Sequence, residues 1–93
     1  MSRAIPVATG TADVQGYTGA CTLVGVAARE TAGAATAQVA LRDGTSISDP
    51  IVAIINLAIG GYLHNPLPAV QCSTGIFIDR TGTGSSELVL YVM

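Results

Sequence analysis

The chain has 93 residues, enough for one small domain with a single core; 49% of them are hydrophobic and 11% are charged, against about 25% charged residues in a typical domain. Lysine is absent, four arginines are the only basic residues besides one histidine, and the net charge is −2, which excludes a cationic cluster able to hold nucleic acid. We therefore expect surplus apolar surface that another protein covers.

The N-terminal segment, residues 1–18, is rich in Gly, Thr and Ala and has only short apolar stretches. It predicts a flexible arm or an edge strand, followed by a β-sandwich domain over residues 19–93. No long apolar run ends in a small-residue cleavage site, so we expect no signal peptide. A segment of this composition has little to bury alone, and residues 2–17 are therefore expected to take part in docking.

Two strands are predicted next, over residues 20–30 and 36–43. In the second strand Ala37, Val39 and Leu41 alternate with more polar residues and so share one face.

The connections around these strands carry turn and loop signals. The alanines of residues 29–39 allow a helix as an alternative, but Gly33 and the neighbouring threonines favour β structure. Asp43 and Gly44 predict a tight turn because both residue types tolerate positive φ.

The segment from Ile51 to Ile59 is the longest apolar run, interrupted only by Asn56. It is far shorter than the roughly 20 residues that span a bilayer, so we expect no membrane partner. Both of its alternating faces are largely apolar. This pattern predicts either a central strand of the sandwich or a strand that a neighbouring subunit covers.

The C-terminal third alternates turn signals with short strands. Pro66 and Pro68 predict a loop over residues 65–68, because proline cannot donate to a sheet ladder. Strands are expected at residues 69–72, 75–80 and 87–93, with a flexible hairpin tip at 81–86. Short β segments between recurrent turns predict an all-β fold, a small antiparallel β-sandwich or jelly-roll-like domain of about six to eight strands.

Cys21 and Cys72 are the two cysteines. A disulfide between them is one possibility, but in the absence of a secretion signal we expect reduced, buried thiols.

Residues able to support catalysis or metal binding are few. A serine triad would have to use His64, the only histidine, which we interpret as a loop or packing residue. Zinc would need Cys21, Cys72 and His64, none of which are spaced as a chelating pair. The Thr81–Gly84 stretch does not precede a helix, and the acidic residues fit surface positions better than a cation loop. We therefore expect no enzyme, no catalytic residue, no cofactor and no metal.

The order of segments resembles a known family. The segments are GACTLVGVAARET, ATAQVALRDGTS, PIVAIINLAIGG, PLPAVQCSTGIFIDRTGTGS and ELVLYVM, over about residues 19–93. They resemble small virion proteins of tailed phages of actinobacteria, namely capsid decoration or head-fibre proteins. The resemblance implies a homo-oligomer, with a trimer favoured, that docks on the major capsid protein and stabilises the head shell. It also implies assembly in the host cytoplasm and a final location in the virion.

Two other functions remain open on the sequence. One is a tail or baseplate-spike component, which the same composition permits. The other is a carbohydrate-binding, adhesin-like β-module, which would have to use Tyr17, Tyr62, Tyr91 or Phe77, because sugar sites favour exposed aromatic rings.

Overall fold

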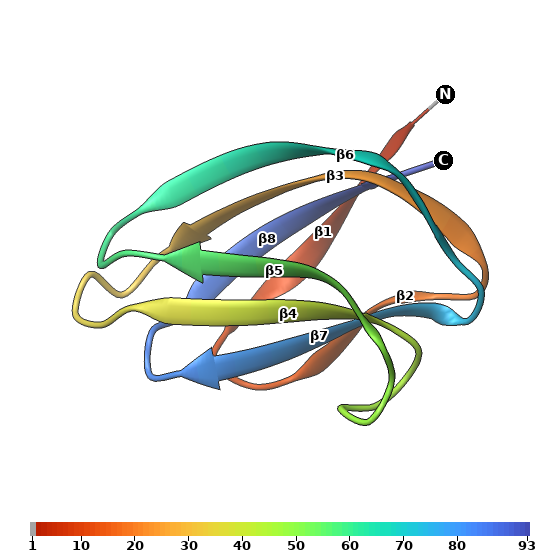
Figure 1. Cartoon of the computed structure of the whole chain (residues 1–93). Helices are drawn as coiled ribbons and strands as arrows, with labels where there is room; N and C mark the ends of the chain where they lie inside the picture. The colour runs from red at the N-terminus through yellow and green to blue at the C-terminus, as the bar shows by residue number, and fades with distance from the viewer. Residues whose placement is uncertain (1) are drawn as a thin grey trace.

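Two four-stranded sheets pack face to face in the computed structural model, which describes residues 2–93 (Figure 1). Met1, the first residue of the predicted arm, lies outside the described residues. Sheet A has the strand order β1-β8-β3-β6 and sheet B the order β2-β7-β4-β5, with antiparallel pairing throughout. The strands are β1 (Arg3–Gly10), β2 (Val14–Thr18), β3 (Cys21–Glu30), β4 (Ala37–Asp43), β5 (Ile51–Leu57), β6 (Tyr62–Cys72), β7 (Gly75–Gly82) and β8 (Ser86–Val92). The predicted all-β sandwich is confirmed.

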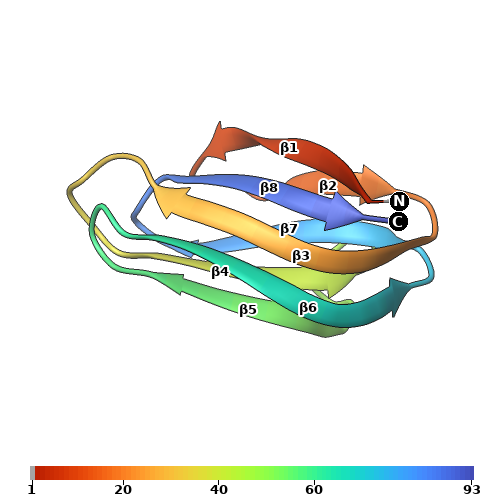
Figure 2. The ribbon, with the colours of Figure 1, turned by 90° about the horizontal axis from the view of Figure 1, so that it is seen from above.

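The chain passes from one sheet to the other at every connection except the β4–β5 hairpin, and Figure 2 shows the two layers from above. The prediction of a hairpin tip at residues 81–86 is therefore wrong, since this segment links β7 in sheet B to β8 in sheet A.

The Gly84 N–H donates to the Thr36 carbonyl at 3.0 Å. A Cβ atom on Gly84 would lie 2.6 Å from that oxygen, so this close approach requires glycine.

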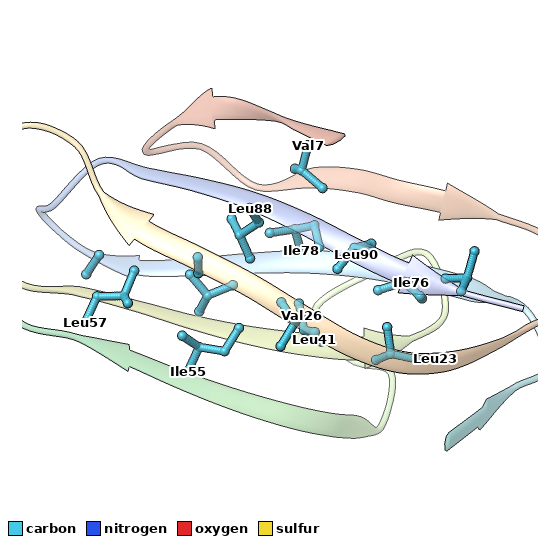
Figure 3. Close-up of a cluster of buried hydrophobic side chains, with 14 of the residues drawn as sticks. Val7, Leu23, Val26, Leu41, Ile55, Leu57, Ile76, Ile78, Leu88 and Leu90 are labelled. Carbon is cyan, nitrogen blue, oxygen red and sulfur yellow. The ribbon is translucent and has the colours of Figure 1, made fainter. Parts of the chain in front are cut away.

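The core lies between the sheets and is aliphatic (Figure 3). The face predicted for Ala37, Val39 and Leu41 is confirmed, because all three side chains are buried. Alternate residues of β3 and β8 in sheet A supply most of the opposing side chains, and alternate residues of β7 extend the buried face beside β4 in sheet B. The buried apolar residues are Val7, Leu23, Val26, Ala28, Ala37, Val39, Leu41, Ile55, Leu57, Cys72, Ile76, Ile78, Leu88, Leu90 and Val92.

Residues 3–18 form two edge strands, one in each sheet. β1 pairs with β8 and β2 pairs with β7. Val7 of β1 is buried in the core, and Tyr17 of β2 packs against it. This segment is therefore part of the folded sandwich, and removing it would strip one edge from both sheets.

The loop predicted over residues 65–68 is wrong, since β6 continues through both prolines to Cys72. Gly25 pairs with Pro66 and Leu23 pairs with Val70, so three residues of β6 lie opposite one residue of β3. Ala69, inside this bulge, has a φ of 53°. Proline is tolerated because β6 is an edge strand and the bulge interrupts its ladder.

The central position predicted for Ile51–Ile59 is also wrong. β5 is the edge strand of sheet B and ends at Leu57. Its core face is buried at Ile55, whereas the Ile54 side chain on the outer face is 58% exposed. The other predicted possibility, cover by a neighbouring subunit, stays a prediction.

The helical alternative over residues 29–39 is wrong, because β3 runs to Glu30 and β4 begins at Ala37 with a loop between them. Residues 2–93 contain no helix that is long and apolar enough to cross a membrane.

Candidate interaction surface

The acidic residues are engaged within the fold. All six carboxylates accept a hydrogen bond from a backbone N–H or an arginine, and most of them fix a loop. The pairs of acceptor and donor are Asp13 with Arg80, Glu30 with Ala32, Asp43 with Ser73, Asp49 with Thr45, Asp79 with Arg42, and Glu87 with Arg29. The few negative charges of this chain are therefore used to hold its loops and strands together.

Glu30 accepts from three backbone N–H groups and Asp43 from two. Glu30 accepts from the N–H groups of Gly60, Ala32 and Gly33 at 2.8 to 3.0 Å, which ties the β3–β4 loop to the β5–β6 turn. These bonds, that of Gly60 first, lower the pKa of the Glu30 carboxyl. Asp43 accepts from the N–H groups at residues 73 and 74, which lowers its pKa in the same way.

The arginines are engaged as well. The Arg80 guanidinium enters the end of the sandwich and donates to the carbonyls of Ala8, Ala12 and Ser86. Burial lowers the pKa of Arg80. Arg42 bonds Asp79 at 3.0 Å with both side chains largely buried, whereas the pair of Arg29 and Glu87 is exposed.

Arg3 completes the set of arginines, because it donates to the Tyr17 hydroxyl and lies over the Tyr17 ring. Every buried side-chain nitrogen or oxygen in the described part of the chain has a partner.

Exposed apolar side chains concentrate along β5 and the turns at its two ends. Six large hydrophobic residues are exposed among residues 2–93, and all but Met93 lie between residues 47 and 62. We call this set the β5 flank; it consists of Ile47, Ile51, Ile54, Ile59 and Tyr62. No charged residue occurs from position 50 to position 63. From Ile51 to Tyr62 the β5 flank is therefore free of charge, and it runs along the side of the sandwich where β5 and β6 are the edge strands. Exposed apolar surface of this kind marks protein contacts.

The edge of β5 also differs from the other three edges of the sandwich. β1 contains Pro6 and β6 contains Pro66 and Pro68, and both strands have bulges in their ladders. β2 is five residues long and has a register shift. β5 has no proline and no charge, and its one register shift lies near its start. Prolines, bulges and charges are the devices that keep edges from pairing, and β5 lacks them over most of its length.

A shallow hollow lies on the outer face of sheet A. Tyr62, His64, Arg29 and Glu87 line it, and the ring centroids of His64 and Tyr91 are 5.5 Å apart. Tyr62 is 85% exposed, the most exposed large apolar residue described. His64 lies on strand β6 and not in a loop, and its ring packs against the Tyr91 ring. Of the two roles predicted for His64, the packing role is the one that the fold supports.

The structure brings the two cysteines together, which their separation in sequence does not reveal. Cys21 on β3 pairs directly with Cys72 on β6, and both thiols are free. Cys72 is buried and Cys21 half-buried. Burial, with the Cys21 thiol beside it, raises the pKa of Cys72 to about 11.

The zinc alternative gains no support from this pair. His64 pairs with Ala27, six positions along β3 from Cys21, or roughly 20 Å in an extended strand. Within residues 2–93 no group of three His, Cys, Asp or Glu side chains could hold a metal ion.

The sequence did not predict that β5 is an open edge strand, although the lack of charge from position 50 to 63 indicates an exposed apolar segment.

Comparison of the chain with protein-family models, curated proteins and solved structures finds no match.

Proposed function

We propose that this chain is a non-enzymatic structural protein of a tailed-phage virion, a capsid decoration protein that docks on the major capsid protein and stabilises the head shell. The observation that carries the proposal is the β5 flank, which holds five of the six large apolar side chains that are exposed among residues 2–93. Such a strip favours burial against protein in an assembly.

The use of charge supports the same function. Since all six carboxylates and all four arginines bond within the chain, little charge is free to steer a small charged substrate or a polyanion. The loops are short and pinned by these bonds. A rigid, weakly charged sandwich suits a role in which the protein contributes contact area to an assembly.

The experiment is co-sedimentation of the purified chain with assembled heads that lack it, followed by heating of the heads. The proposal expects saturable binding and a higher temperature of shell rupture. Tyr62→Ser and Ile59→Ser remove exposed apolar area without touching the core, and we expect each to bind more weakly. Met93→Ser, which changes an exposed apolar residue outside the β5 flank, is the matched control and should bind as wild type. Heads that neither bind the chain nor gain thermal stability would contradict the proposal.

The aromatic row on sheet A favours a second candidate, binding of carbohydrate. Tyr62, His64 and Tyr91 lie along one face beside the ion pair of Arg29 and Glu87, and sugars stack on exposed rings and bond to such polar groups. Titration of a glycan panel by calorimetry tests it. Binding that Tyr62→Ala abolishes and Phe77→Ala leaves intact would favour this function over the first.

A further inference from the structure

The hydrogen-bond pattern of β5 determines which of its backbone groups have no partner in the chain. The Asp43 N–H donates to the Pro50 carbonyl at 2.9 Å, so the backbone groups of Asp43 point toward β5. Alternate residues of β4 do the same, because bonded and non-bonded pairs alternate in an antiparallel ladder. The bonded pairs are then Leu41 with Ala53, Val39 with Ile55, and Ala37 with Leu57.

The residues between these pairs point the other way. The N–H and C=O groups of Ile54 and Asn56 are directed to the open edge of sheet B, where no strand follows β5. Val52 is the extra residue at the register shift, so the alternation does not extend to it. Side chains cannot satisfy a row of alternating donors and acceptors as well as another extended strand does. The edge is therefore built to accept a strand.

We infer that the occupant is a second copy of this chain, paired antiparallel through β5 about a two-fold axis at Ile54. This inference rests on the proposed assembly role of the β5 flank and names its partner. In this register Ile54 lies opposite its own copy, and Val52 lies opposite Asn56 of the other copy. The pair of Ile54 residues exchanges two hydrogen bonds, and the two sheets B become one continuous eight-stranded sheet.

Composition favours self-pairing. β5 has no charge, so two copies meet without the like-charge repulsion that a charged edge would bring. Stable interfaces bury about 1,000 Å² or more, and the exposed side chains of Ile47, Ile51 and Ile59 extend the contact beyond the strand itself.

At the far end of sheet B, β2 is short and bulged, so the assembly closes at two copies instead of growing into a fibre.

The test measures the oligomeric state of the full chain by sedimentation equilibrium and the protection of its amides by hydrogen exchange. We expect a dimer at micromolar concentration, with slow exchange at the amides of Ile54 and Asn56 that becomes fast on dilution. Ile54→Pro removes an N–H that makes no bond within the chain, and Ile54→Lys adds a charge at the axis. Each variant should weaken the dimer at least about tenfold while the circular dichroism spectrum stays β-rich.

Met93→Lys is the matched control, because Met93 is 60% exposed, close to the 58% of Ile54, lies outside the β5 flank and should leave the dimer intact. A wild-type chain that stays monomeric at several hundred micromolar overturns the inference, as does a dimer that persists in Ile54→Pro. If the monomeric chain still binds phage heads, the proposed function stands and a capsid strand is the occupant of β5. If it dimerises but ignores heads, the pairing stands and the proposed function fails.

Discussion

Glu30 and Asp43 are single residues that hold loops from different parts of the chain. Hydrogen bonds from backbone N–H groups lower the pKa of both carboxyls. The ionised carboxylates therefore contribute to the free energy of unfolding above the ordinary carboxyl range, near about pH 4. This contribution is lost as the pH falls through the lowered pKa values of the folded chain. We predict that urea stability drops between pH 5 and pH 2 in the wild-type chain.

The matched test combines Glu30→Gln with Asp43→Asn. This double variant should be less stable at pH 7 and should lose less on acidification, whereas Glu87→Gln, in an exposed ion pair, should behave as wild type. An unchanged acid response in the double variant would contradict the role given to these carboxylates.

Ala69 adopts a left-handed backbone conformation that costs a non-glycine residue roughly 1 kcal/mol. We predict that Ala69→Gly raises the free energy of unfolding by up to about 1 kcal/mol, measured by urea denaturation. Ala40→Gly, in the regular part of β4, should lower it by roughly 0.5–1 kcal/mol. Equal losses at the two positions would show that the conformation of Ala69 is not strained.

Cys72 has a raised pKa of about 11, so its thiol stays protonated at neutral pH. In a Cys21→Ser background we predict that iodoacetamide labels Cys72 slowly at pH 8 and quickly in urea, as followed by mass spectrometry. Native labelling as fast as in the unfolded chain would contradict the burial of this thiol. In the wild-type chain, a loss of two hydrogens from the intact mass would reveal a disulfide instead of the reduced pair.

At the scale of the element, adjacent residues of β5 have opposite environments. Ile55 is 2% exposed and Ile54 is 58% exposed. We predict that Ile55→Asp costs several kcal/mol and unfolds the domain, since it buries an unpaired carboxylate. Ile54→Asp should cost about 1 kcal/mol and keep the fold, as judged by circular dichroism and urea denaturation. Similar losses in both variants would mean that the outer face of β5 is covered within the chain.

Local patterns predicted most of the elements, and the failures have physical causes. The alternation of Ala37, Val39 and Leu41 identified a strand and its buried face. Pro66 and Pro68 suggested a loop because a sequence does not show that a strand lies at an edge, where a bulge makes proline acceptable. In the same way, an apolar run such as Ile51–Ile59 cannot distinguish a central strand from an edge strand that a partner covers.

At the scale of the whole molecule, the sequence predicted the surplus of apolar surface but not its place. The order of strands gathers that surface along β5, and it aligns Cys21 with Cys72 across 51 positions of chain. Pairings of this kind depend on how the chain crosses between the sheets, which short-range patterns do not encode. The residues of the β5 flank are close in sequence, and the fold adds that β5 is an open edge strand.

The most direct test of the proposed decoration role is a pair of cryo-electron microscopy maps of phage heads assembled with and without this chain. We predict added density on the outer face of the shell, fitted by the two-sheet sandwich, with β5 at a protein contact. Maps that are identical, or extra density confined to the tail, would contradict it.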